Sequence, residues 1–262
     1  MTPARRVAVV TGAGRGLGRA VALRLASDGI DVAVLARSAG QVEAVAQEVR
    51  AAGARALAVP ADVRSTQAVD QAREEIEARL GPVAIVVNNA GTLLYKPFVP
   101  LPGLADTAPG SGEPVSDGEW DGVIGVHLGG AMRMLRAFGP GMIDRRHGRV
   151  VNVVSNSVRR KVPFTAGYDT AKGALVQLTQ SLAREWGRYG VTVNAVAPGH
   201  FRTPMTEEQF ADPVSYDRMV RRIPVRRTGE PEEFATLVAY LCGPQAGFIT
   251  GEVIAIDGGE TL

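Results

Sequence analysis

The 262-residue chain has an ordinary globular composition, with 45% hydrophobic and 21% charged residues and a net charge of +2. This balance argues against disorder, and without an apolar run of about 18 residues no transmembrane helix or membrane association is predicted. The apolar run Val7–Val10 is too short for a signal-peptide core, so a cytoplasmic protein is expected. The single cysteine, Cys242, excludes an internal disulfide and a thiolate cluster, and no metal site is predicted.

The basic residues do not form the stripe along one element that is typical of a nucleic-acid-binding face. Nearly all of them are arginines, and they stand in short, separate groups without interleaved aromatic residues. These groups are Arg145-Arg146, Arg159-Arg160-Lys161, Arg221-Arg222 and Arg226-Arg227. Charged helix ends in solvent are the favoured interpretation, and no nucleic-acid partner is predicted.

Short, continuous apolar runs recur from end to end, as expected for strands of a parallel sheet that is covered on both faces. The predicted strands are Val7–Val10, Val32–Leu35, Ala56–Val59, Val83–Val87, Val150–Val154, Val191–Val196 and Val253–Ile256. Between the first of them, amphipathic segments stop at a glycine, the usual residue just past a helix. This alternation predicts a single α/β domain over residues 1–262, with a Rossmann-type, doubly wound, seven-stranded parallel sheet and helices on both faces.

A glycine-rich turn, Thr11-Gly12-Ala13-Gly14-Arg15-Gly16-Leu17-Gly18, connects the first strand to the first helix. Glycines at 12, 16 and 18 permit a tight turn and let backbone N–H groups approach a pyrophosphate at the helix N-terminus. The spacing is not G-x-G-x-x-G, and the lysine of an NTPase phosphate loop does not follow. Its place between strand and helix favours dinucleotide binding over a purely structural turn.

The end of the second predicted strand bears on the choice between NAD and NADP. NAD sites place an acidic residue there for the ribose 2′-hydroxyl, whereas NADP sites place arginine near the 2′-phosphate. This strand ends in Ala36-Arg37-Ser38 without a carboxylate, and Arg15 lies in the glycine loop. Two guanidinium groups would hold a phosphate well, so NADP is predicted over NAD. The alternative is that Arg37 is only a solvated strand end.

One segment, residues 92–118, is irregular and holds five prolines and four glycines. Connections in compact domains are usually about 4–6 residues long, so a connection of this length is unusual and indicates a specific role. Two interpretations remain open: a mobile surface loop, or a segment that shapes the mouth of a site.

The candidate catalytic residues are Tyr168, Lys172 and Ser155. Residues four apart lie on one face of a helix, so Lys172 is expected beside the phenol of Tyr168. A free tyrosine has a pKa near ~10, and a neighbouring ammonium would lower that pKa toward the range useful for proton transfer. Ser155 ends the predicted fifth strand, at the sheet edge where such folds bind ligands, although Ser157 is an alternative. A serine nucleophile is disfavoured, since there is no G-x-S-x-G elbow.

These motifs, in this order, resemble those of the short-chain dehydrogenase/reductase family over essentially the whole chain. The residues that carry the resemblance are Thr11-Gly12-x-x-x-Gly16-x-Gly18, Asp62-Val63, Asn88-Asn89-Ala90-Gly91, Ser155, Tyr168-x-x-x-Lys172, Pro198-Gly199 with Thr203, and Asp257-Gly258-Gly259. The resemblance implies a hydride-transferring enzyme that uses a nicotinamide cofactor. It also implies a homo-oligomer, usually a tetramer and less often a dimer.

The resemblance further implies a role for each matching residue. Tyr168 would exchange a proton with the substrate oxygen, Lys172 would hold the nicotinamide ribose and lower the tyrosine pKa, and Ser155 would orient the substrate oxygen. Asp62 would contact the adenine amino group and Asn89 would pack beside the adenosine. The remaining expected cofactor contacts are Gly12, Arg15, Gly16, Leu17, Gly18, Arg37, Val63, Ala90, Gly91, Pro198, Gly199, Phe201 and Thr203.

The sequence departs from the family pattern at His127. It lies in the predicted helix 120–128, where the family usually has an asparagine that holds a water connected to the lysine. Histidine also holds water and adds a group that titrates near neutrality. We therefore interpret His127 as a catalytic-site residue that substitutes in the proton relay.

The resemblance implies a small carbonyl or alcohol substrate, whose identity the sequence leaves open. The segment 200–227, with aromatic residues and methionines among charges, is interpreted as a partly apolar lid over the substrate. The basic group Arg159-Arg160-Lys161 would either steer an anionic substrate or be solvated. Three functions remain: a ketoreductase of 3-oxoacyl or polyketide-like carbonyls, a sugar or polyol dehydrogenase, and a non-catalytic nucleotide sensor.

Overall fold

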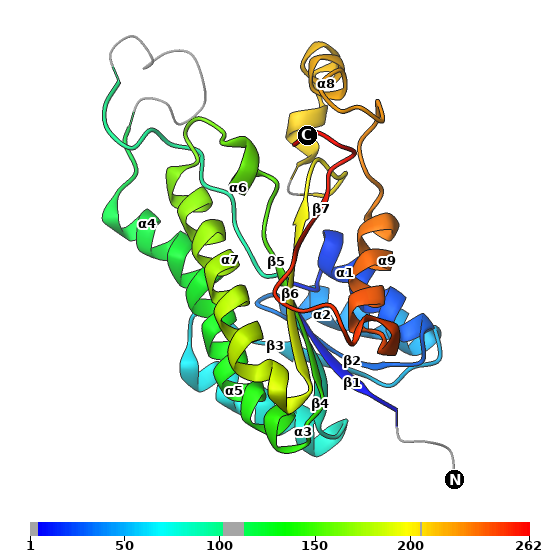
Figure 1. Cartoon of the computed structure of the whole chain (residues 1–262). Helices are drawn as coiled ribbons and strands as arrows, with labels where there is room; N and C mark the ends of the chain where they lie inside the picture. Colours follow the sequence, from blue (N-terminus) through cyan, green and yellow to red (C-terminus); the bar gives the residue numbers. More distant parts are fainter. Residues whose placement is uncertain (1–4, 102–112, 205) are drawn as a thin grey trace.

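A seven-stranded parallel sheet forms the centre of the computed structural model, which describes residues 5–101, 113–204 and 206–262 (Figure 1). The strands are β1 (Val7–Thr11), β2 (Asp31–Ala36), β3 (Ala56–Pro60), β4 (Val83–Asn88), β5 (Gly148–Val153), β6 (Val191–Pro198) and β7 (Val253–Ile256). They are arranged β3-β2-β1-β4-β5-β6-β7, and each adjacent pair is parallel. The predicted fold class is confirmed.

Helices cover both faces of this sheet (Figure 1). One face carries α3 (Thr66–Arg79), α5 (Gly130–Asp144) and α7 (Ala166–Trp186), and the other carries α1 (Gly16–Ser27), α2 (Ala39–Ala51) and α9 (Pro231–Cys242). The shorter helices are α4 (Asp117–Ile124), α6 (Ser157–Arg160) and α8 (Pro213–Val220). Among the described residues, none of the helices is long and apolar enough to cross a bilayer.

The continuous apolar strands follow from this two-sided cover. Val9 and Val10 are neighbours in β1, and each is fully buried in a different core layer. Val9 belongs to the layer that contains Phe138 of α5, whereas Val10 belongs to the layer that contains Phe234 of α9. Successive strand residues point to opposite faces, so a strand between two helical layers must be apolar at every position.

The order in which strands are added to the sheet changes side between β1 and β4. From β1 the sheet grows through β2 to β3 on one side, and from β4 it grows through β5 to β7 on the other. The connections leaving the carboxyl ends of β1 and β4 therefore diverge, which opens a crevice between them. This edge of the sheet positions the candidate site.

The predicted helix 120–128 is interrupted in the structure. Helix α4 ends at Ile124, a π-helical turn (η1) spans Gly125–Gly129, and α5 continues from Gly130. A π-turn accommodates one extra residue in a helix and occurs often at functional sites. Here it carries His127.

The segment 92–118 falls partly outside the described residues, which omit 102–112. Its described beginning is anchored, because the Lys96 N–H donates to the Phe164 carbonyl at 2.9 Å. Leu93 and Leu94 line the crevice. The start of the segment therefore helps to shape the mouth of the site. The predicted lid contains the short helical turn Glu207–Phe210 (η3) and α8.

Candidate active site

A cleft of about 920 Å³ opens at the carboxyl edge of the sheet. Every predicted site residue except Gly18 lines this cleft. These residues are Gly12, Arg15, Gly16, Leu17, Arg37, Asp62, Val63, Asn89, Ala90, Gly91, His127, Ser155, Tyr168, Lys172, Pro198, Gly199, Phe201 and Thr203. Residues that are far apart in the sequence, such as Gly12 and Thr203, thus line the same cleft.

Gly18 has a packing role instead of lining the cleft. A Cβ atom at Gly18 would lie 2.5 Å from both the Gly12 carbonyl oxygen and the Asn89 Nδ2, so only glycine fits there. The Asn89 amide donates to the carbonyl oxygens of Thr11 (3.0 Å) and Gly12 (3.2 Å). Asn89 therefore ties the glycine loop to the end of β4, a role that its position in the sequence did not reveal.

The glycine loop fits a dinucleotide pyrophosphate. Arg15 occupies the N-cap position of α1 in an extended conformation, and no side chain within the described residues caps the helix. The first N–H groups of α1 are therefore available at the wall of the cleft, at the positive end of the helix dipole. Gly12, Gly16 and Leu17 border the same space.

Three arginines, Arg15, Arg37 and Arg64, line the cleft together with Asp62. Arg64 donates to both oxygens of the Asp62 carboxylate, with Nη2 at 2.7 Å from Oδ2. These hydrogen bonds, and to a lesser degree the charge of Arg37, lower the pKa of Asp62. The Asp62 carboxylate is therefore paired with Arg64, while Arg15 and Arg37 border the same space. Sequence reasoning missed Arg64, although a basic residue two positions after Asp62 was a visible signal.

Ser155, Tyr168 and Lys172 meet in the cleft wall. Ser155 lies just beyond β5, and its hydroxyl accepts the Ser157 N–H at 3.2 Å. Because Ser155 lines the cleft and Ser157 is not among the lining residues, the structure favours Ser155 over the alternative serine. Lys172 Nζ lies 5.6 Å from the centre of the Tyr168 ring and donates to the Val153 carbonyl at 2.6 Å.

The pKa of Tyr168 differs from the sequence-based expectation. Burial raises it, and this effect outweighs the hydrogen bond with Ser155, which lowers it. Lys172 is only 3% exposed, and burial lowers its pKa to about 7. The prediction that the ammonium lowers the tyrosine pKa is therefore wrong for this structure, because burial disfavours both charged forms. At neutral pH the phenol is protonated.

His127 lies against the catalytic pair. Its ring stands edge-on to that of Tyr168, with 5.2 Å between centroids and an interplanar angle of 89°. Its Nε2 lies 2.8 Å from the carbonyl oxygen and 3.1 Å from the amide nitrogen of Thr92. A Cβ atom on Gly91 would lie 2.5 Å from Cε1, so glycine at 91 makes room for this ring.

His127 does not titrate near neutrality, so that expectation is wrong. Burial, followed by the charge of Lys172, lowers the pKa of His127 to about 3. In the tautomer that donates from Nε2 to the Thr92 carbonyl, the buried Nδ1 keeps a free lone pair, and it has no partner among the described residues. The side chain is thus a neutral imidazole with an unused acceptor near the lysine.

Sequence reasoning did not single out the other lining residues, although Thr92, Leu93 and Leu94 lie in the segment 92–118 and Pro204 and Thr206 lie in the predicted lid. These other lining residues are Gly14, Leu35, Ala36, Ser38, Gln41, Ala61, Arg64, Thr92, Leu93, Leu94, Glu119, Gly122, Val123, Val126, Val153, Val154, Pro204 and Thr206. Many of them neighbour a predicted residue in the chain, and that proximity was the available signal. Glu119 comes from α4 and Val126 from the π-turn.

Comparison with known proteins agrees with this arrangement. A family model described as "Enoyl-(Acyl carrier protein) reductase" matches residues 12–261. The short-chain reductase protein NovJ of Streptomyces niveus is 39% identical, over 97% of this chain and 93% of its own. The 3-oxoacyl-(acyl-carrier-protein) reductase FabG of Staphylococcus epidermidis is 36% identical, over 96% of this chain and 97% of its own.

Two solved structures are also similar to this chain along nearly its whole length. A putative gluconate dehydrogenase from Agrobacterium tumefaciens has a TM-score of 0.89 and 32% identity, with 98% of this chain and 96% of that chain covered. A variant of actinorhodin polyketide ketoreductase with NADPH has a TM-score of 0.87 and 33% identity, with 98% and 97% covered.

Proposed function

The chain belongs to the short-chain dehydrogenase/reductase family and is an oxidoreductase that acts on C=O or CH–OH groups, and from this premise we propose that it is an NADPH-dependent ketoreductase. The observation that carries the proposal is the convergence of Ser155, Tyr168 and Lys172 on one wall of the cleft. A bound nicotinamide would supply or accept the hydride.

In reduction, the Tyr168 hydroxyl donates the proton that the carbonyl oxygen takes up. The phenol carries this proton at neutral pH, since burial raises its pKa above the ordinary value. The Ser155 hydroxyl accepts the Ser157 N–H and also makes a hydrogen bond with Tyr168, so both hydroxyl groups lie within reach of one substrate oxygen. The two hydroxyl groups therefore orient and polarise the carbonyl together.

Lys172 supplies a proton behind Tyr168, and His127 holds the water that connects with it. The pKa of Lys172, about 7, lets its ammonium release and regain a proton near neutrality. His127 is neutral, and its unpartnered Nδ1 is suited to accept a hydrogen bond from a water beside Lys172. We assign His127 the place in the relay that an asparagine usually has in this family.

NADPH is proposed because of the charges at the adenosine end of the cleft. Arg15 and Arg37 line it, and Asp62, the carboxylate nearby, is already paired with Arg64. A 2′-phosphate would meet two guanidinium groups there, which suits bidentate recognition. The likeness to a ketoreductase structure that contains NADPH also supports this choice.

A 3-oxoacyl or polyketide-like ketone is the proposed substrate class, because NovJ, FabG and actinorhodin ketoreductase are reductases. A sugar or polyol dehydrogenase is the second candidate, favoured by the likeness to a putative gluconate dehydrogenase. The third, a nucleotide sensor without turnover, has less support because Ser155, Tyr168 and Lys172 are all present. The homo-oligomeric state and cytoplasmic location remain predictions.

The test is NADPH oxidation with a panel of 3-keto-esters, cyclic ketones and keto-sugars. We expect turnover with the keto-esters and ketones, whereas turnover restricted to keto-sugars would favour the second candidate. Tyr168→Phe should lower kcat by about 100-fold or more while NADPH affinity stays close to wild type, because only the proton donor is removed. NADPH binding without turnover of any compound would instead support the sensor.

A further inference from the structure

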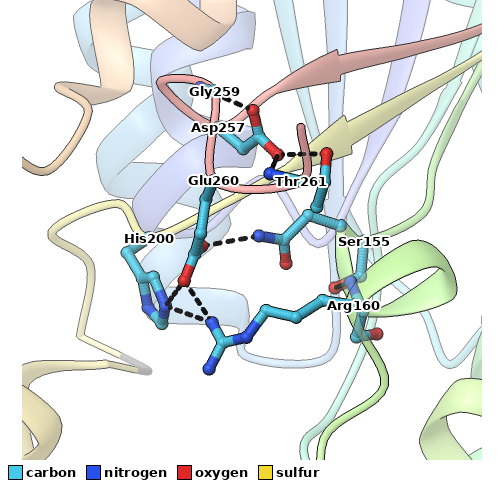
Figure 2. A network of polar contacts seen from close by, with 9 residues as sticks. Ser155, Arg160, His200, Asp257, Gly259, Glu260 and Thr261 are labelled. Carbon is cyan, nitrogen blue, oxygen red and sulfur yellow. Dashed lines mark hydrogen bonds and ion pairs between the residues drawn. The ribbon is translucent and has the colours of Figure 1, made fainter. Parts of the chain in front are cut away.

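A carboxylate shortly after β7, Glu260, is the centre of a polar network (Figure 2). Its side chain is only 2% exposed. Asn156 Nδ2 donates to Oε2 at 2.8 Å, and Arg160 Nη1 donates to Oε1. His200 Nε2 lies 3.4 Å from the same Oε1. One buried carboxylate thus joins the segment after Ser155 and the segment after Gly199.

The turn that carries Glu260 is held by Asp257. Its Oδ1 accepts the Gly259 N–H at 3.0 Å, and its Oδ2 accepts the N–H (3.1 Å) and the hydroxyl (2.7 Å) of Thr261 (Figure 2). These bonds close a compact turn directly after β7. Glu260 is therefore presented from a rigid element, and its carboxylate has little freedom to follow its partners.

Glu260 is anionic in this setting. Burial raises the pKa of its carboxyl group, but His200, Arg160 and Asn156 together outweigh that effect, and the pKa is lowered. A buried carboxylate needs its partners in place, because an uncompensated buried charge is strongly destabilising. Of the basic group at 159–161, Arg160 is partly buried and paired with Glu260, whereas Arg159 and Lys161 are exposed.

The segments joined by Glu260 form two sides of the cleft. The Asn156 N–H donates to the Pro198 carbonyl at 3.0 Å, and the Gly199 N–H donates to the Ile256 carbonyl at 3.0 Å. Ser155, Pro198 and Gly199 line the cleft, whereas Glu260 is not among its lining residues in the described part of the chain. Any displacement of Glu260 must therefore reach the reacting groups through these neighbours.

Resting on the function proposed above, we infer that Glu260 is a positioning residue for hydride transfer. It fixes the turn of Ser155 and Asn156 relative to the strand end of Pro198 and Gly199. In this way it sets the distance between the serine hydroxyl, which orients the carbonyl, and the backbone at the nicotinamide end. A shift of about 1 Å in such a relation is sufficient to lower turnover by about 100-fold.

The variant that tests this inference is Glu260→Gln, which keeps the side chain's size and removes its charge. We expect kcat with a keto-ester to fall about 10- to 100-fold, while KM and the Kd of NADPH stay within about threefold, because the binding surfaces are retained. Glu252→Gln, an exposed carboxylate at the opposite end of β7, is the matched control and should behave as wild type. A folded Glu260→Gln protein with wild-type kcat would overturn the inference.

A second measurement asks whether Glu260 acts through Ser155. In a Ser155→Ala background, Glu260→Gln should lower the residual kcat less than about twofold, because coupled residues are not additive. A full further loss would overturn the inference. If Ser155→Ala itself kept wild-type kcat, the proposed function would fail instead. Should Glu260→Gln not fold, Asn156→Ala removes the bond to Glu260 from the residue next to Ser155, and wild-type kcat there would contradict the inference.

Discussion

Replacing Lys172 by methionine should stabilise the protein while removing its activity, and the gain in stability should depend on pH. Lys172 is 3% exposed, and burial lowers its pKa from 10.5 to about 7. At about 1.4 kcal/mol per pH unit, this difference corresponds to roughly 5 kcal/mol of cost for the charged form in the folded protein. A buried ammonium near the substrate is thus kept at the expense of stability.

The direction of this pH dependence follows from the number of protons bound in the folded and unfolded states. Between pH 7 and 10.5 the unfolded chain holds a proton on Lys172 that the folded protein has released, so stability rises with pH across this range. Lys172 therefore lowers the free energy of unfolding by about 4 kcal/mol at pH 7 and by about 2 kcal/mol at pH 9. Lys172→Met should therefore raise the free energy of unfolding by about 2 kcal/mol more at pH 7 than at pH 9.

Urea unfolding at the two pH values measures this difference directly. The hydrogen bond from Lys172 to the Val153 carbonyl is lost in the variant at both pH values, so it cancels from the comparison. Lys161→Met is the control, since that side chain is exposed. An equal change in stability at both pH values for Lys172→Met would refute the reasoning.

Three further predictions concern the cleft. Arg37→Asp should weaken NADPH binding by about 10-fold or more and shift preference toward NADH, by loss of a charge-assisted bond; an unchanged ratio of the two Kd values would place the 2′-phosphate elsewhere. His127→Asn should move the alkaline limb of the pH dependence of kcat toward higher pH, since the smaller amide admits water beside Lys172 and raises the pKa of Lys172. An alkaline limb at the wild-type pH would argue against a role of His127 in the relay. Gly91→Ala should cost about 1–3 kcal/mol in unfolding and lower kcat, because its Cβ would lie 2.5 Å from the His127 ring. Gly173→Ala, which meets no atom within 4 Å, is the control, and equal stability of the two variants would contradict the packing argument.

Much of the fold was predictable because its determinants are local. The apolar strands, the glycine stops and the alternation of strands with helices each follow from a few adjacent residues, and the parallel sheet follows from their order. The π-turn at Gly125–Gly129 was not predictable from periodicity, since one extra residue in a helix leaves the apolar pattern on either side nearly intact.

In the candidate site, too, some features follow from the local sequence and others depend on the folded chain. The spacing of Tyr168 and Lys172 predicts that they share a helix face, because helix geometry alone dictates it. Their pKa values depend on burial, which is a property of the assembled walls, so the expected lowering at Tyr168 was wrong and His127 proved to be neutral. Arg64 beside Asp62 and Glu260 beside Asn156 likewise depend on the folded chain.

What the sequence determined by itself is therefore the set of chemical groups and their order along the chain: a glycine loop, arginines without a competing strand-end carboxylate, and a phenol one helical turn from an amine. Only the tertiary structure decided which of these groups are charged and what holds them. Charge depends on the dielectric around a side chain, and support depends on contacts between segments such as those of Ser155 and Glu260, which meet only when the sheet is complete.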